Sequence, residues 1–335
     1  MKVKIFAVKK EIYMRKILGK PMFQYVVEAV THAGLTDISV VIIDNNKSIE
    51  AEIKNIFKNI NISTHDSEQE EKNKLLTLGA NMPLITSDEI KELIKQEEKR
   101  IYEAPASTHV NTEKEIAEAI AVLQTRINEK HMSSGVRFID PKSVFIDSTV
   151  EIEAGATIYP NVIIEGDSTI MANAIIGANS QIKDSFIGAF AHVKYSVLDG
   201  ARVGAKTDVG PFAYLRPEAV IGKSCRIGNF VEVKKANIGD NTKMAHLAYV
   251  GDADVGNDVN IGCGVITVNY DGAKKHRTTI GDKAFIGSNS NLVAPVEIGT
   301  GAFVAAGSTV TENIPEDALG IARAYQVIKL NWRKK

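Results

Sequence analysis

The chain has 335 residues, 44% of them hydrophobic and 24% charged, and its 40 basic and 41 acidic residues give a formal net charge of −1. This length predicts two domains, and the near-neutral balance argues against a nucleic-acid-binding protein, although a local patch for a small anion is compatible with it. The two cysteines, Cys225 and Cys263, lack metal-ligand spacing and no stretch is apolar enough to span a bilayer, so we expect a cytoplasmic protein without membrane insertion.

Up to about residue 141, short β-branched runs alternate with helical ones. KVKIFAV (2–8) and ISVVIID (38–44) are typical of buried strands, and residues 21–35 predict a helix that ends at Gly34. A second helix is expected over 87–101, with Ser87 or Asp88 as its N-cap. Because strands and helices alternate, we predict an α/β domain with a parallel sheet over residues 1–110.

A third helix is predicted over residues 111–134. Thr112 and Glu115 have the spacing of a capping box, in which each side chain accepts a hydrogen bond from the other residue's backbone N–H. An apolar stripe follows at helical spacing, formed by Ile116, Ile120, Leu123 and Ile127. We interpret this helix as a linker between two domains.

The pattern changes in the second domain, which we place at residues 135–335. Pairs of an aliphatic residue and a glycine recur six or twelve residues apart, for example at Val203-Gly204, Val209-Gly210 and Ile221-Gly222. This spacing predicts a left-handed parallel β-helix of hexapeptide repeats, three to a coil. The aliphatic residue should point inward, while the glycine, or an Asn or Asp nearby, should turn the corner. Residues inserted in VNYDGAKKHRT (268–278) predict a loop that leaves the coils.

His246 stands out in an otherwise small and apolar run of this domain. A lone histidine is more often a surface residue than a catalyst. Coils of about eighteen residues would, however, bring further polar side chains next to it, namely Tyr249, Asn260, Asn269, Tyr270 and Lys275. The sequence therefore predicts a polar cluster on one side of the β-helix.

Seven segments of this domain carry a resemblance to a known family. They are AYLRP (213–217), GNFVEVKK (228–235), MAHLAYVGD (244–252), GNDVNIGCGVITVNYDGAKK (256–275), IGSNSNLVAPV (286–296), VAAGSTVT (304–311) and ALGIARAYQ (318–326). Over roughly residues 135–332 the chain resembles the acetyltransferase domain of the bacterial bifunctional N-acetylglucosamine-1-phosphate uridyltransferase / glucosamine-1-phosphate acetyltransferase. The resemblance implies a homotrimer that uses acetyl-CoA.

The resemblance also implies roles for individual residues. His246 matches the general base, a task that suits imidazole because its ordinary pKa lies near neutrality. The positions that bind the amino-sugar phosphate are Arg216, Lys234 and Lys275 for the phosphate and Tyr249 and Asn260 for the sugar. Asn269 also matches a sugar-contacting position, and we group it with the positions along acetyl-CoA, which are Asn269, Tyr270, Ser288, Ala306 and Arg323.

Three segments of the first domain, 18–30, 75–86 and 110–132, resemble pieces of the family's uridyltransferase domain. The family's glycine-rich phosphate loop is missing, because no glycine precedes Gly19. Asn81 stands where the family has an aspartate that helps to hold Mg²⁺, and a neutral amide is a poor ligand for that cation. We therefore expect this activity to be lost, no Mg²⁺ cofactor, and a domain that serves as a scaffold or as a repurposed binding domain.

The leading prediction is an acetyl-CoA-dependent N-acetyltransferase that acts on glucosamine 1-phosphate for cell-envelope precursor synthesis. An alternative acceptor is another amino-sugar phosphate, such as galactosamine 1-phosphate. A zinc enzyme of the β-helix type fits poorly, because histidine ligands at set spacing are missing. A non-catalytic paralogue with a structural or regulatory role is also open.

Overall fold

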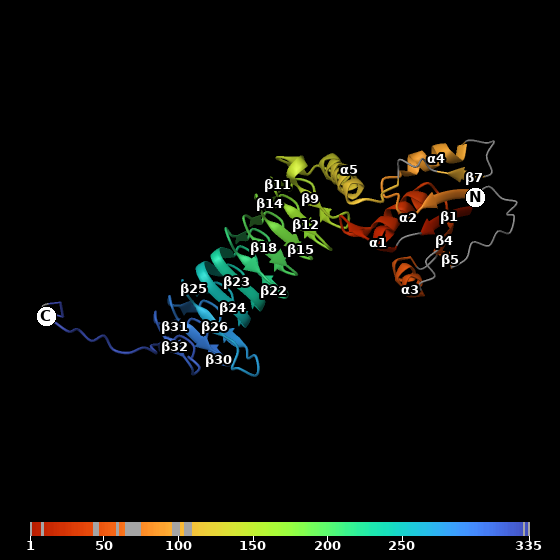
Figure 1. Ribbon diagram of the computed structural model, residues 1–335. Helices are drawn as coiled ribbons and strands as arrows, with labels where there is room; N and C mark the ends of the chain where they lie inside the picture. Colours follow the sequence, from red (N-terminus) through yellow and green to blue (C-terminus); the bar gives the residue numbers. More distant parts are fainter. Residues whose placement is uncertain are drawn as a thin grey trace. The chain divides into compact units, whose positions relative to one another are not determined.

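The computed structural model describes residues 2–7, 10–42, 47–57, 60–63, 75–95, 101–103, 109–330 and 332–333. The chain divides into two compact units, Met1–Ile127 and Asn128–Lys335 (Figure 1). The division falls inside α5 (Glu113–Ser133), the helix that the sequence predicts over 111–134. None of the described helices is long and apolar enough to cross a membrane.

The first unit is built on a five-stranded parallel sheet. The order is β5-β4-β1-β6-β7, with bounds Lys2–Ala7 (β1), Asp37–Ile42 (β4), Asn61–Ser63 (β5), Leu75–Gly79 (β6) and Ile101–Glu103 (β7). Helices α1 (Lys10–Tyr13), α2 (Met22–His32), α3 (Lys47–Ile56) and α4 (Ser87–Lys95) connect the strands, and β2 (Lys16–Ile17) pairs with β3 (Lys20–Pro21). Because all sheet partners run parallel, the predicted α/β class is confirmed.

Two details of the predicted helices differ in the structure. Helix α4 is described over Ser87–Lys95, residues 96–100 lie outside the described residues, and Ile101 belongs to strand β7, so the predicted helix over 87–101 does not reach Ile101. Its cap is Thr86, whose hydroxyl accepts from the Glu89 N–H (3.2 Å) while Glu89 accepts from the Thr86 N–H (2.7 Å). The same reciprocal contact confirms the box at Thr112 and Glu115.

The second unit is a left-handed parallel β-helix with three faces (Figure 1). The first face holds β10 (Glu151–Ile152), β13 (Thr169–Ile170), β16 (Phe186–Ile187), β19 (Arg202–Val203), β22 (Ala219–Ile221), β27 (Thr278–Ile280) and β30 (Val296–Ile298). The second holds β8 (Arg137–Phe138), β11 (Thr157–Ile158), β14 (Ile175–Ile176), β17 (His192–Val193), β20 (Asp208–Val209), β25 (Asn260–Ile261), β28 (Phe285–Ile286), β31 (Phe303–Val304) and β33 (Leu319–Gly320). The third holds β9 (Phe145–Ile146), β12 (Ile163–Glu165), β15 (Gln181–Lys183), β18 (Val197–Asp199), β21 (Tyr214–Leu215), β26 (Ile266–Val268), β29 (Asn291–Val293) and β32 (Thr309–Val310).

Two longer strands, β23 (Arg226–Ile238) and β24 (Lys243–Val255), continue round all three faces. We call the corner between the second and third faces the site edge, and the corner between the third and first faces the far edge. Coils begin after α5, where the Asn128 amide donates to the carbonyls of Pro141 (2.8 Å) and Val144 (3.0 Å). A short 3-10 helix (Pro141–Ser143) lies in this first turn.

The core is a set of aliphatic columns, as predicted. On the first face Ile152, Ile170, Ile187, Val203 and Ile221 lie in register on successive coils and are buried. Each coil thus buries its apolar side chains only against its neighbours, which is why the repeat needs one aliphatic residue in six.

The repeat glycine mostly does not turn the corner, whereas the predicted Asn or Asp nearby does so at several corners. The left-handed corner residue lies two positions after the glycine of the pair, as at Asn241 (φ 60°) and Asp258 (φ 57°), and elsewhere it is another residue type, such as Lys206 (φ 60°). The glycines are needed where stacked coils touch, since a Cβ on Gly204 would lie 2.4 Å from the Gly222 carbonyl oxygen. Close backbone approach therefore explains the glycine of each pair.

One coil contains an inserted hairpin. Register partners on the first face are mostly 16 to 18 residues apart, but Asp254 pairs with Thr279, which is 25 residues further on. The extra residues form a loop at the far edge, closed by an antiparallel bridge between Tyr270 and Lys275. This is the loop that the sequence predicts from the break in the repeat.

Candidate functional site

The predicted catalytic residue lies at the site edge. His246 pairs in register with Asn229 of the preceding coil, and its Nδ1 lies 2.9 Å from Asn229 Oδ1. An amide oxygen only accepts hydrogen bonds, so this contact places the proton on Nδ1 and leaves Nε2 with its lone pair. The ring is exposed within one chain, so Nε2 is free to receive a proton from a ligand over the third face.

Three cations from three segments converge on the third face. Arg216 follows β21, Lys234 lies in β23, and Lys275 reaches in from the hairpin. The positive charges of Arg216 and then Lys275 lower the pKa of Lys234 below its ordinary value. Three positive groups held this close would suit a multiply charged anion such as a phosphate.

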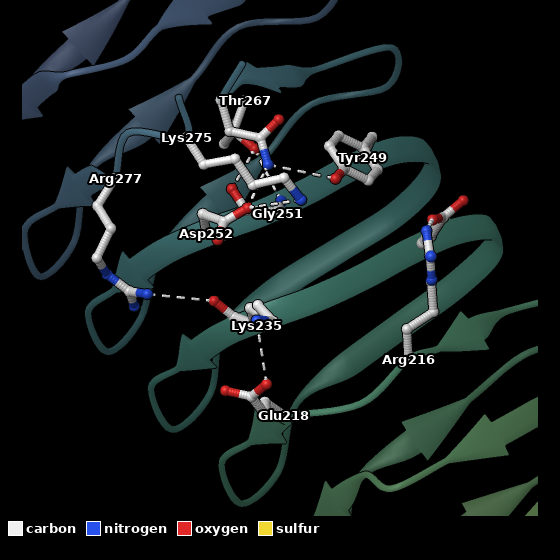
Figure 2. A network of polar contacts seen from close by, with 11 residues as sticks. Arg216, Glu218, Lys235, Tyr249, Gly251, Asp252, Thr267, Lys275 and Arg277 are labelled. Atoms are coloured by element: carbon white, nitrogen blue, oxygen red, sulfur yellow. Dashed lines mark hydrogen bonds and ion pairs between the residues drawn. The ribbon is translucent and has the colours of Figure 1, made fainter. Parts of the chain in front are cut away.

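Each outer cation has a carboxylate partner. Arg216 donates to Glu232 Oε1 at 2.6 Å, and this hydrogen bond is the main reason that the pKa of Arg216 is raised. Lys275 Nζ lies 3.8 Å from Asp252 Oδ2 (Figure 2). The carboxylates hold the two side chains in place, whereas the contacts among the described residues give Lys234 no such carboxylate partner.

Asp252 also links the sugar-contacting residues. Its Oδ2 accepts from Asn269 Nδ2 at 2.5 Å, and the same amide lies 3.4 Å from the Tyr249 hydroxyl. The Thr267 hydroxyl joins this coil to β24, because it accepts from the Gly251 N–H (2.8 Å) and donates to the Gly251 carbonyl (2.9 Å; Figure 2). Tyr249, Asp252 and the buried Asn269 therefore form one polar network next to Lys275.

Two of the predicted coenzyme positions lie further along the site edge. Ser288 and Ala306 are exposed at this edge on successive coils, where the Gly307 N–H donates to the Ser288 carbonyl. Arg323 lies past the last coil, near Gly307. Tyr270 lies on the hairpin, and its hydroxyl donates to the Gly272 carbonyl (2.7 Å). A thioester carrier lying along this edge would bring its reactive end to His246.

The structure separates three predicted residues from the sets in which they were grouped. Asn260 lies on the second face, in register with Lys243 and Phe285, across the site edge from the cations. Asn269, grouped with the coenzyme positions, bonds to the sugar-contacting side through Asp252, and Tyr270 lies on the hairpin at the far edge, away from Ser288 and Ala306. All three assignments remain predictions.

Sequence reasoning missed four residues that organise the site, namely Asn229, Glu232, Asp252 and Arg277. Asn229 and His246 are 17 residues apart, so the coil period could have identified this pair. The link between Asp254 and Arg277 spans 23 residues and crosses the insertion, where the period gives no guide.

A second polar cluster lies at the carboxyl end of β6 in the first unit. Asn81 Oδ1 is 3.0 Å from His109 Nδ1, while Asn81 Nδ2 donates to Asn111 Oδ1 (2.8 Å) and to the Val110 carbonyl (3.3 Å). The amide thus has protein partners on both of its polar atoms. Within the described ranges no group of three His, Cys, Asp or Glu side chains is arranged to hold a metal ion.

Comparison with known proteins finds relatives of the β-helix. A family model described as bacterial transferase hexapeptide (six repeats) matches residues 149–184 and 277–312. The bifunctional protein GlmU of Clostridium botulinum (strain Kyoto / Type A2) is 51% identical over 226 residues, which is 68% of this chain and 50% of that protein. The chain resembles bifunctional GlmU.

GlmU of Acetivibrio thermocellus is 52% identical over 223 residues, which cover 67% of this chain and 48% of that protein. The chain therefore spans about half the length of the curated GlmU relatives it matches. Among solved structures, an Arabidopsis UDP-N-acetylglucosamine acyltransferase matches with a TM-score of 0.35 and 17% identity over 56% of this chain and 66% of that chain. The likeness to GlmU is much the stronger of the two.

Proposed function

We propose that the β-helix is an N-acetyltransferase that moves acetyl from acetyl-CoA to the amine of glucosamine 1-phosphate, yielding N-acetylglucosamine 1-phosphate for cell-envelope precursors. The observation that carries this proposal is the position of His246. It lies at the site edge, which borders the third face with its three cations and carries Ser288 and Ala306 on later coils. A base that lies close to both a phosphate-binding group and a bound thioester fits acyl transfer to an amine on a phosphorylated molecule.

In the proposed mechanism Arg216, Lys234 and Lys275 bind the phosphate, and Tyr249 with Asn269 orients the sugar. His246 Nε2 accepts a proton from the amine as the nitrogen attacks the thioester carbonyl. The tetrahedral intermediate then collapses, the C–S bond breaks, and the coenzyme leaves as its thiol after taking up a proton. Asn229 keeps the imidazole in the required tautomer by accepting from Nδ1–H.

The test is acetyl transfer in the full chain, followed as free thiol release and as N-acetylated product. We expect turnover that requires both acetyl-CoA and glucosamine 1-phosphate. Competition with galactosamine 1-phosphate, which differs at one hydroxyl, tests the acceptor. Preference for the galactose epimer would shift the proposal to that sugar, and absence of transfer to either would favour the non-catalytic paralogue.

We further propose that the active form is a homotrimer in the cytoplasm. Four apolar residues form a ladder along the site edge, namely Tyr195, Phe212, Phe230 and Leu247. Phe212 and Phe230 stack at 5.6 Å between ring centroids, and all four backbones have positive φ. A bulky residue in that region costs about 1–3 kcal/mol, so an exposed ladder of them supports burial against another copy.

For the first unit we propose a scaffold without uridyltransferase activity and without a Mg²⁺ cofactor. Asn81 is neutral and already bonded to His109, Asn111 and Val110, which does not fit a hard cation that prefers carboxylate oxygen. The check is to supply UTP, Mg²⁺ and N-acetylglucosamine 1-phosphate and to measure pyrophosphate. We expect none above background, whereas turnover that saturates with UTP would contradict the proposal.

A further inference from the structure

The hairpin that carries Lys275 is tied together internally. The carboxylate of Asp271 accepts from the backbone N–H groups of Ala273 (2.7 Å) and Lys274 (2.6 Å), and His276 Nε2 lies 2.7 Å from its other oxygen. The His276 N–H donates to the Asn269 carbonyl at 2.9 Å. The hairpin is therefore a small unit held together by its own hydrogen bonds.

The hairpin is mostly exposed to solvent. Residues 271–275 are exposed, and Tyr270 is 57% exposed with its hydroxyl turned back to Gly272. Polar contacts at the two ends of the hairpin, next to strands β26 and β27, therefore help to hold Lys275 over the third face. At one end Asn269 is bonded to Asp252.

Arg277 anchors the other end to two coils. Its guanidinium makes a two-pronged contact with Asp254 (2.8 and 2.6 Å) and also donates to the carbonyls of Ala253 (3.0 Å) and Lys235 (3.3 Å; Figure 2). This contact lowers the pKa of Asp254 and raises that of Arg277. Because its donors face Asp254 and two carbonyls, Arg277 is not itself a fourth phosphate ligand.

We infer that Arg277 is a positioning residue, which sets Lys275 in the anion subsite by fastening the hairpin to β24. The inference rests on the proposed function for the identity of the phosphorylated substrate. A planar fork is needed for this task, because a lysine reaches Asp254 with one group but cannot bridge the carboxylate and two carbonyls at once.

The experiment is a double-mutant cycle with Arg277→Met and Lys275→Met in the full chain. We expect Arg277→Met to raise the KM for glucosamine 1-phosphate by about 10- to 100-fold, the scale of a lost charged hydrogen bond. The kcat should stay within about threefold of the wild-type value. The KM of the double variant should be no higher than that of Lys275→Met alone. Arg277→Lys should restore part of the loss, and the matched control Arg202→Met, on the same face beside Phe186, should change neither constant.

A second arm needs no turnover. Inorganic phosphate should protect Lys275 from an amine-reactive label in the wild type, and protection in Arg277→Met should need about tenfold more phosphate. Additive losses in the cycle, or unchanged protection of Lys275, would overturn the inference. If the wild type transfers no acetyl, the proposed function fails while the phosphate arm still decides the role of Arg277.

Discussion

At the scale of single residues, the site contains three cations that repel one another and two carboxylates that partly neutralise them. Lys234 has its pKa lowered by Arg216 and Lys275, whereas these two cations contact Glu232 and Asp252. A lowered pKa means that the neutral amine appears at a lower pH. A bound phosphate dianion would reverse this by favouring the ammonium form.

Lys234 should therefore react with an amine-directed reagent at lower pH than Lys243, which lies on the second face. Trace labelling with acetic anhydride across a pH series, read by mass spectrometry, measures both lysines in one sample. Glucosamine 1-phosphate should shift the Lys234 profile to higher pH and leave Lys243 unchanged. Identical profiles for the two lysines would contradict the three-cation subsite.

The residue scale also shows what the sequence could yield. The resemblance supplied His246 and the cations, because their motifs are contiguous in the chain. Asn229 could have been found from the coil period, and Asp252 could not, because its partners Asn269 and Lys275 lie beyond a stretch with an irregular repeat. The orientation of a side chain across an insertion depends on tertiary contacts that no local pattern encodes.

At the scale of elements, the hairpin is the least regular part of the β-helix and depends on Asp271. Hydrogen bonds from the Lys274 N–H, His276 and the Ala273 N–H hold the pKa of this carboxyl far below its ordinary value. A depressed pKa in the folded state stabilises the hairpin at pH values above the unfolded pKa of about 3.9. The stabilisation is lost as the pH falls through the depressed pKa.

We predict that Asp271 stays ionised at pH 3, where an ordinary aspartate is mostly protonated. Carboxyl carbon shifts recorded by NMR from about pH 6 to 2 measure this directly. In His276→Ala the pKa should rise only part of the way, because the two backbone donors remain. A wild-type midpoint near the ordinary value would show that the hairpin is not ordered as described.

The elements themselves were predictable where the pattern is strong. The aliphatic period predicts the β-helix coils, and the strand–helix alternation predicts the parallel sheet. The start of strand β7 at Ile101 was not predictable, because QEEKR (96–100) before it has the composition of a helix; residues 96–100 themselves lie outside the described residues. The acidic run at 68–71 lies outside them as well.

At the scale of the whole molecule, the account predicts that the apolar ladder drives assembly. The double variant Phe212→Asn/Phe230→Asn should be a monomer, because it removes two rings of the ladder. Asparagine tolerates positive φ, so the corners of the β-helix should be preserved. Light scattering gives the mass, and far-UV circular dichroism confirms the fold. Phe190→Asn is the matched control, because Phe190 is an equally exposed aromatic with φ 59° at a different corner. A double variant that remains trimeric would show that the ladder is not the interface.

The molecule combines a β-helix with a smaller α/β unit, and the part of it that matches the GlmU relatives spans about half of their length. The two units differ in their polar clusters. In the β-helix the cations point toward a common anion subsite, whereas Asn81, His109 and Asn111 bond to one another. Chemistry is therefore expected in the second unit alone.

The most direct measurement is the rate of acetyl transfer from acetyl-CoA to glucosamine 1-phosphate by the wild type and by His246→Ala, with His192→Ala as control. His192 is also exposed but pairs with Asp208 on the second face. The account predicts that the wild type and His192→Ala turn over, and that His246→Ala loses about 10²- to 10⁴-fold in kcat. A His246→Ala enzyme with wild-type kcat would contradict the central claim that this imidazole is the base.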